Sequence, residues 1–243
     1  MKKHLSVFGL FARSSVYKVL GILGLMCLSE ISIFALKFSR EPLAEYVGRF
    51  EHYINISHLT ICLGIAFVLI TIILCLPGTE YGSKVGYTIR RLRLSERAVF
   101  YYQAVFNLVM YILLWAVQIG LLYGLSLWYT AAVPTKFTNN QAIFLAFYRD
   151  NFLHTILPLS EVMLWIRNFL LIIALSFASA EFPYIQRRKG YGILIALVVI
   201  FVLIFFITDI GMVKNIIFSI VLFIIVVCKT LYNIYHKEDF YDK

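Results

Sequence analysis

Six apolar stretches, separated by polar segments, recur along this chain of 243 residues. They cover residues 19–36, 58–76, 98–130, 160–180, 191–208 and 213–231. A helix needs about 20 mainly apolar residues to cross the hydrocarbon core of a bilayer. The pattern therefore predicts an all-α, polytopic membrane protein with six transmembrane helices. The third stretch is too long for a perpendicular span, so we expect it to tilt or to project beyond the bilayer.

Composition supports this fold class and excludes a soluble one. The chain is 61% hydrophobic and only 14% charged, whereas soluble domains are roughly half apolar. No polar segment is long enough to build a hydrophobic core of its own, so residues 1–243 are predicted to form a single transmembrane domain. The net charge of +9 does not indicate nucleic-acid binding, because the basic residues lie in short runs beside the apolar stretches, where they face lipid headgroups.

The basic residues divide unequally between the two sides of the predicted membrane domain. Fifteen lie in residues 1–18, 77–97, 181–190 and 229–243, and six lie in the segments on the opposite side. Short cytoplasmic segments are enriched in Lys and Arg. Both termini are therefore predicted to be cytoplasmic, and the chain is expected to lie in a cell (plasma) membrane.

Two further segments are predicted to lie along the membrane surface. Residues 1–18 place Leu5, Phe8 and Phe11 on one side of a short interfacial helix, with a frayed tail as the alternative. No convincing small-x-small cleavage site follows, so the segment is expected to remain uncleaved. Residues 131–159 are extracellular in this topology and too apolar for a free loop. These residues predict one or two amphipathic helices, with Asn139 or Asn140 as N-cap. The helices could act as a lid over an exit path or could simply pack over the ends of the spans.

Catalytic and metal-binding patterns are sparse in this sequence. The four cysteines include no CxxC pair, and the five histidines include no HExxH. No G-x-S-x-G is present, and no carboxylate pair falls within a span. We therefore expect no enzymatic activity, no metal and no cofactor of this chain's own, with an intramembrane enzyme as a weaker alternative.

The polar residues that fall inside the predicted spans include Glu30, Gln118 and Arg167. At 1.5 Å per residue, Glu30 and Arg167 lie at similar depths near the middle of the bilayer. A charge there is costly and faces the bundle interior or a partner, so a direct or water-bridged pair of Glu30 with Arg167 is one hypothesis. The alternatives are an outward-reaching Arg167 and a protonated Glu30 that is hydrogen-bonded to Gln118.

The largest polar segment, residues 77–97, is cytoplasmic in the predicted topology. It begins with Pro77 and Gly78, which end a helix. A short helix over residues 87–94 would bring Tyr87, Arg90 and Arg91 together. Ser95 is expected to cap the next helix. The mixed aromatic, apolar and basic surface of residues 87–92 is typical of a docking element.

Six spans, an N-terminal interfacial segment and this loop, followed by SERAVFYYQAVFNLVMYILLWAVQ, together resemble the permease subunits of bacterial type-2 ABC exporters, particularly short ones from Gram-positive bacteria. The resemblance implies an ATP-driven exporter with a separate cytosolic ATPase that holds ATP and Mg, and a second permease copy or paralogue. It implies ATPase coupling through Gly86, Tyr87, Thr88, Arg90, Arg91 and Leu92.

This chain departs from many of those permeases in one respect, because only residues 208–212 separate its last two spans and leave no room for re-entrant helices. A non-transporting accessory or immunity protein is the competing class. The sequence does not choose a substrate.

Overall fold

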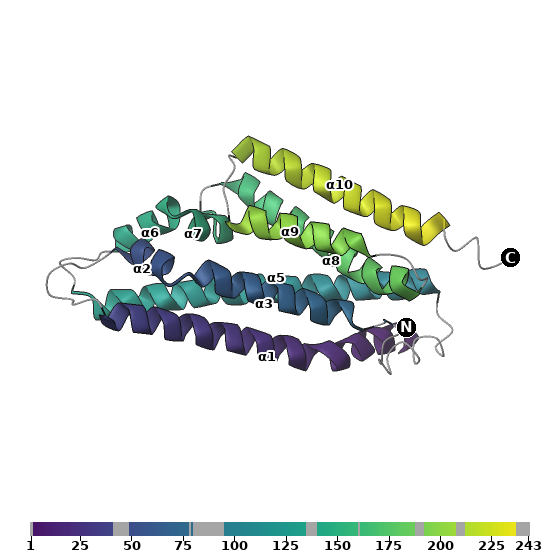
Figure 1. Ribbon diagram of the computed structural model, residues 1–243, viewed down its shortest axis with the longest axis horizontal. Coiled ribbons are helices and arrows are strands. Elements are labelled where there is room, and N and C mark those ends of the chain that lie inside the picture. The colour runs from purple at the N-terminus through teal and green to yellow at the C-terminus, as the bar shows by residue number, and fades with distance from the viewer. Residues whose placement is uncertain are drawn as a thin grey trace.

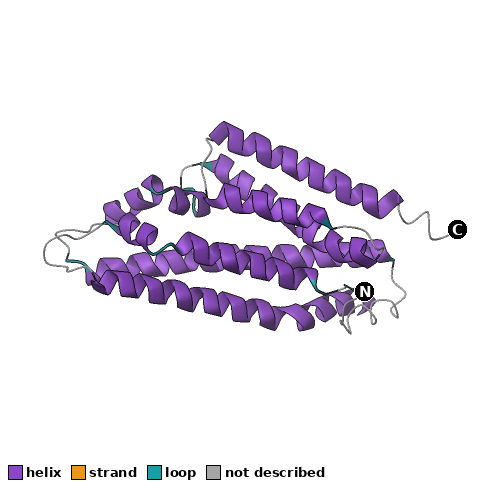
Figure 2. Cartoon of the chain, viewed as in Figure 1, coloured by secondary structure: helices purple, strands orange, loops and turns teal. Residues whose placement is uncertain are grey.

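The computed structural model describes residues 2–40, 49–77, 79, 95–134, 140–159, 161–187, 192–207 and 212–236. Within these ranges the chain is helical and contains no strand (Figure 2). The helices are α1 (Lys2–Arg40), α2 (Phe50–Ile56), α3 (Leu59–Cys75), α5 (Glu96–Ala132), α6 (Asn140–Arg149), α7 (Asn151–Ile156), α8 (Val162–Arg187), α9 (Ile193–Ile207) and α10 (Met212–His236). The predicted all-α class is confirmed.

The long helices lie roughly side by side along the long axis of the molecule (Figure 1). Helix α1 packs on α3 and α5, α5 packs on α8, and α8 carries α9 and α10. The start of α1 and the end of α10 lie at the same end of the bundle, whereas α2 and α6 lie at the opposite end (Figure 1). We refer to these as the terminal end and the far end.

Four helices, α1, α5, α8 and α10, are long and apolar enough to cross a membrane, and the bent pair α2–α3 brings the number to five. Helix α9 is strongly apolar but has only 15 residues, which is short for a span. The structure therefore establishes four to five candidate spans of the predicted six. Large apolar side chains are exposed on the outer faces of these helices, for example Ile217, Ile224 and Ile225 on α10, as expected of surfaces in contact with lipid.

The N-terminal prediction needs correction. Residues 2–40 form one continuous helix of 39 residues, so the N-terminal segment is not a separate interfacial helix. The sequence contains no proline before Arg40, so no residue of this segment lacks the backbone N–H that the helical hydrogen-bond ladder needs. Phe11, in this segment, is fully buried and stacks on Phe106 of α5.

Helices α2 and α3 meet at an angle of 53°. The break falls at His58, whose φ of 49° and ψ of 38° place it in the left-handed region. A non-glycine residue rarely adopts this conformation, and here it ends the helical ladder after Ser57. The second predicted span is thus the helix α3, preceded at its N-terminal end by the short helix α2, which is bent away from it.

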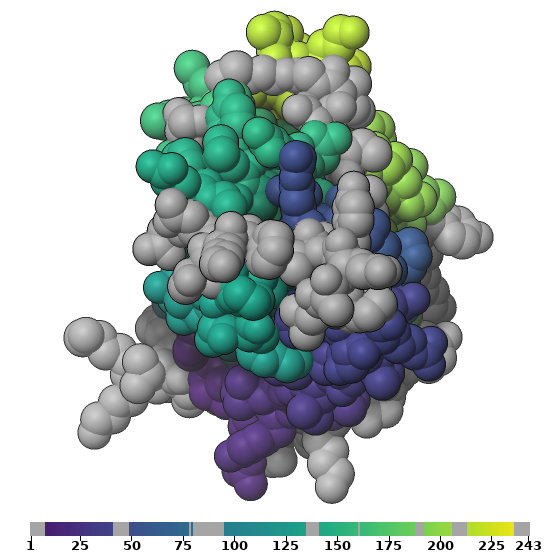
Figure 3. All heavy atoms as spheres, turned by 90° about the vertical axis from the view of Figure 1, so that its left-hand side faces the viewer, coloured from purple at the N-terminus to yellow at the C-terminus, as the bar shows by residue number. Residues whose placement is uncertain are grey.

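Two sequence predictions on helix boundaries are confirmed. Ser95 caps α5, since its hydroxyl accepts a hydrogen bond from the Ala98 backbone N–H at 3.4 Å. Residues 131–159 contain the two expected short helices, α6 and α7, at the far end. Seen from that end, α6 and α7 lie beside α2 (Figure 3). Residue 139, one of the two expected caps, lies outside the described residues.

Candidate functional site

The inward face of α5 carries a file of polar side chains along most of its length. Gln103, Asn107, Tyr111, Gln118 and Ser126 are each at most 3% exposed. Their separations of four, four, seven and eight residues place them on one side of the helix. Polar groups at this depth need partners, because lipid provides none. Their hydrogen bonds therefore define how α5 holds its neighbours.

At the terminal end, the file joins α5 to the end of α3. The side-chain amide of Gln103 donates to the carbonyl oxygens of Leu74 and Pro77, at 3.4 and 3.2 Å. These carbonyls lie at the C-terminus of α3, where the last carbonyl groups of a helix have no N–H partner within the helix. One side chain thus closes the helix end from which the 77–97 loop departs.

One turn further along α5, the file reaches α8. The Asn107 amide donates to the Ser179 hydroxyl at 2.8 Å. The Ser179 backbone carbonyl accepts from the Cys75 thiol, whose sulfur lies 3.8 Å away. Ser179 precedes Pro183 by four residues, and proline has no N–H to donate to that carbonyl. Cys75 of α3 supplies the missing donor.

In the middle of the bundle, α5 contacts α3 and α7. The Tyr111 hydroxyl donates to the Thr71 hydroxyl at 3.2 Å, and Thr71 donates to the Phe67 carbonyl at 2.8 Å. The Trp115 indole donates to the Ile156 carbonyl at 3.0 Å. The short helix α7 is thereby fixed over the bundle, which favours the packing role over a freely moving lid.

Gln118 forms the link between α5 and α1. Its amide nitrogen donates to Glu30 Oε2 at 3.0 Å, and both side chains are fully buried. The second carboxylate oxygen of Glu30 and the amide oxygen of Gln118 have no hydrogen-bond partner. The hydrogen bond between Glu30 and Gln118, one of the sequence alternatives, is therefore formed.

A direct pair of Glu30 with Arg167 is wrong, because the Arg167 guanidinium bonds to a different group. Its Nε and Nη2 atoms donate to Asn168 Oδ1 at 3.2 and 3.0 Å. Asn168 in turn donates to the Thr155 carbonyl of α7 at 2.8 Å. Matching depth did not bring the two charges together, because α1 packs on α3 and α5 while Arg167 lies on α8 beside α7.

A second buried carboxylate, Glu181, is not among the sequence-predicted site residues. It is 1% exposed and lies on α8, which extends six residues beyond Glu181 to Arg187. Its oxygens accept hydrogen bonds from Asn233 at 2.6 Å and Thr230 at 3.1 Å, both on α10. The predicted span ended at residue 180, so Glu181 was assigned to a loop. The i, i+3 spacing of Thr230 and Asn233 on an apolar helix was the available signal.

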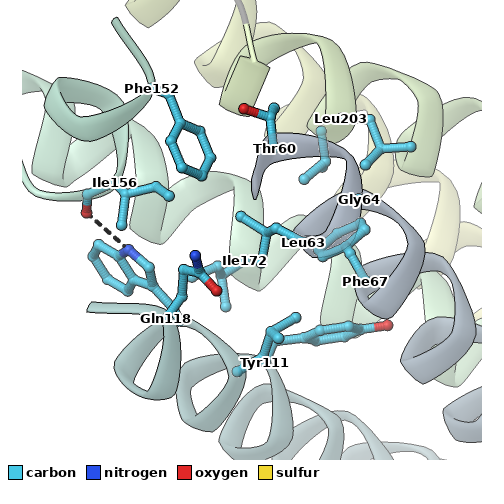
Figure 4. A pocket seen from close by; sticks show the side chains of 13 residues that line it. Thr60, Leu63, Gly64, Phe67, Tyr111, Gln118, Phe152, Ile156, Ile172 and Leu203 are labelled. Atoms are coloured by element: carbon cyan, nitrogen blue, oxygen red, sulfur yellow. Dashed lines mark hydrogen bonds between the residues drawn. The ribbon is translucent and has the colours of Figure 1, made fainter. Parts of the chain in front are cut away.

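Two cavities lie beside the polar file, on either side of Phe67 and Thr71. The first, of about 40 Å³, lies among α3, α5, α7, α8 and α9 (Figure 4). Its walls are mainly apolar and include Phe67, Trp115 and Phe152, and Gln118 contributes its amide. The second, of about 410 Å³, lies nearer the terminal end between α3, α8 and α9, where Thr71, Cys75, Thr79 and Gln186 are its polar members.

The remaining predicted site residues, Gly86, Tyr87, Thr88, Arg90, Arg91 and Leu92, lie outside the described residues. Among the residues that the structure does describe, no three His, Cys, Asp or Glu side chains are grouped to hold a metal ion. The arrangement that the structure describes offers hydrogen-bonding groups inside an apolar bundle.

Comparisons with known protein families, with curated proteins and with solved structures find no match to this chain. Fold and site together define a helical, membrane-embedded protein with a buried polar file along its central helix.

Proposed function

We propose that this chain is the membrane-spanning subunit of an ATP-driven exporter in a bacterial cell membrane. The observation that carries the proposal is the polar file on α5, from Gln103 to Ser126, two members of which, Tyr111 and Gln118, line the first cavity. Polar side chains inside transmembrane segments are costly and commonly mark the path of a transported solute. The resemblance of the sequence to type-2 permeases of Gram-positive bacteria supports the same function.

The proposal includes six spans, with α9 as the fifth and both termini cytoplasmic. Support comes from the position of the helix ends, since the start of α1 and the end of α10 lie at the same end (Figure 1). A chain that begins and ends on one side crosses an even number of times. The excess of basic residues in the segments at this end favours a cytoplasmic location.

The coupling of ATP hydrolysis to the membrane domain is assigned to the 77–97 loop. This loop joins α3 to α5, which are also linked by the hydrogen bond from Gln103 to the Leu74 carbonyl. Both helices line the first cavity, and α5 carries the polar file. A partner ATPase, which binds ATP and Mg, would push on Gly86–Leu92 and thereby move both helices. A second permease copy or paralogue completes the transporter.

The test is capture of the ATPase subunit expected from a neighbouring reading frame. Arg90→Glu with Arg91→Glu reverses charge in the coupling element, so we expect at least a tenfold loss of ATPase co-purification. Lys84→Glu with Arg93→Glu makes the same charge change in the same loop, outside the docking residues, and serves as the matched control. Equal capture by both double variants would contradict coupling through Arg90 and Arg91. Absence of any ATPase partner would favour the accessory or immunity class.

A further inference from the structure

The first cavity has one strongly polar feature, the amide of Gln118. Gln118 is fully buried, and its side chain projects from α5 toward the space enclosed by the apolar walls (Figure 4). Its amide nitrogen is engaged with Glu30, and its amide oxygen has no partner. An unpaired buried acceptor costs about 1–3 kcal/mol. The cavity therefore contains a hydrogen-bond acceptor that lacks a donor.

Glu30 determines which end of the amide is left for the cavity. Glu30 Oε2 accepts from the Gln118 amide nitrogen at 3.0 Å, so the NH₂ group of Gln118 is turned toward Glu30. The carbonyl oxygen then remains on the cavity side. Glu30 thus determines which group of the Gln118 amide faces the cavity, although Glu30 itself does not line the cavity.

The rest of the cavity selects for an apolar body. Phe67, Trp115 and Phe152 contribute aromatic faces, and Leu63 and Ile172 close the space between them (Figure 4). A volume of about 40 Å³ exceeds the about 10–15 Å³ that one water needs but is well below the about 150 Å³ of a cavity that encloses benzene, so the site has room for the hydroxyl-bearing end of a small molecule whose apolar body lies toward the rim. The half-buried residues Leu63, Gly64 and Leu203 form its rim between α3 and α9, on the side that faces lipid.

We propose that this cavity binds a small hydrophobic molecule that carries a hydroxyl group, which donates its hydrogen bond to Gln118 Oε1 and enters from the bilayer between α3 and α9. As a statement about the transported substrate, this rests on the proposed function. As a statement about binding, it applies to the chain alone and is measured without an ATPase.

The experiment compares two fluorinated probes of nearly equal size by ligand-observed ¹⁹F NMR on the full chain in detergent. One probe, 4-fluorophenol, carries the hydroxyl, and the other, 4-fluorotoluene, replaces it by a methyl group. We expect 4-fluorophenol to bind about tenfold more tightly, as one hydrogen bond to an otherwise unpaired acceptor allows. Gln118→Met removes the acceptor and should reduce the preference to less than twofold.

A second variant blocks the cavity without touching the polar pair. The Cβ of a side chain at Gly64 would lie 3.7 Å from Leu203 Cδ2, in ordinary contact, so Gly64→Leu should fill the rim while raising helix propensity. Binding of both probes should fall at least fivefold. Gly120→Leu, on an exposed face of α5 where a Cβ meets nothing within 4 Å, is the matched control for partition into detergent and should leave binding unchanged.

Three results would overturn the inference. They are equal affinity for the two probes in the unmodified protein, a preference that survives Gln118→Met, and tighter binding of 4-fluoroanisole, which offers only an acceptor, than of 4-fluorophenol. Failure of the exporter proposal would instead appear as a missing ATPase interaction with probe binding intact.

Discussion

At the scale of single residues, Glu30 and Gln118 show how a charge-bearing side chain is accommodated inside the bundle. Gln118 satisfies one carboxylate oxygen, at 3.0 Å, and leaves the other without a partner, together with its own amide oxygen. A glutamine at position 30 would keep an oxygen that accepts from the Gln118 amide nitrogen, and it would remove a buried ionisable group.

We therefore expect Glu30→Gln to leave the free energy of unfolding within about 1 kcal/mol of the original protein, or to raise it. Glu30→Leu should lower it by about 1–3 kcal/mol, because the Gln118 amide then loses its acceptor. Unfolding in mixed detergent micelles measures both effects.

The double variant Glu30→Leu with Gln118→Leu is the internal control. Removing both partners is expected to be less damaging than Glu30→Leu alone. Combining Glu30→Gln with Arg167→Gln should instead give additive effects within about 0.5 kcal/mol, since Glu30 accepts from Gln118 whereas Arg167 donates to Asn168. A large departure from additivity would contradict the separation of Glu30 from Arg167 seen here.

At the scale of elements, the joint between α3 and α8 depends on a proline inside a helix. Pro183 leaves the Ser179 carbonyl of α8 without its intrahelical donor. The Cys75 thiol of α3 approaches that carbonyl at 3.8 Å, and the neighbouring Asn107 of α5 holds the Ser179 hydroxyl at 2.8 Å. Three helices thus meet at one residue, whose carbonyl accepts from Cys75 of α3 and whose hydroxyl accepts from Asn107 of α5.

Cys75→Ala is expected to lower the free energy of unfolding by about 1–2 kcal/mol, because it removes the donor to a buried carbonyl. Cys75→Ser keeps a donor of similar size and should cost less than half as much. Cys228→Ala, at an exposed position of α10, controls for loss of a thiol as such. If Cys75→Ser and Cys75→Ala were equally unstable, the hydrogen bond to Ser179 would not contribute.

At the scale of the whole molecule, the number of membrane crossings depends on α9, the shortest of the long apolar helices. Its 15 residues are about 22 Å long at 1.5 Å per residue, against a hydrocarbon thickness of roughly 30 Å. Flanking residues and local thinning of the bilayer can accommodate such a mismatch. The antiparallel course of α8, α9 and α10 in Figure 1 is the one expected of three successive crossings.

Six crossings give a distinct pattern of labelling by an impermeant thiol reagent in whole cells. Cysteines introduced at Ser83 and Gly190 should be shielded, and those at Thr138 and Thr208 should be labelled. If α9 does not cross, Thr208 should be shielded like Gly190, and the C-terminus would lie outside. Labelling of Ser83 in intact cells would reverse the predicted orientation.

The helical class and most helix positions could be predicted from the sequence, because both depend on local properties. Long apolar runs must be helical in lipid, and Ser95 caps α5 through an atom three residues away. The continuity of residues 2–40 was missed because a short amphipathic pattern does not reveal whether the helix bends. The left-handed His58 was missed because nothing in its residue type requires that conformation.

The sequence by itself determined which polar groups would have to be buried, since Glu30, Gln118 and Arg167 fall inside apolar runs wherever the helices pack. The tertiary structure decided the partner of Glu30. Depth is a one-dimensional quantity fixed by residue number, whereas a hydrogen bond between helices also requires that the two helices be neighbours and turn the right faces toward each other. Gln118 meets Glu30 because α5 packs on α1. Arg167 bonds to its chain neighbour Asn168 on the same helix, and packing decided only that Asn168 reaches the Thr155 carbonyl of α7.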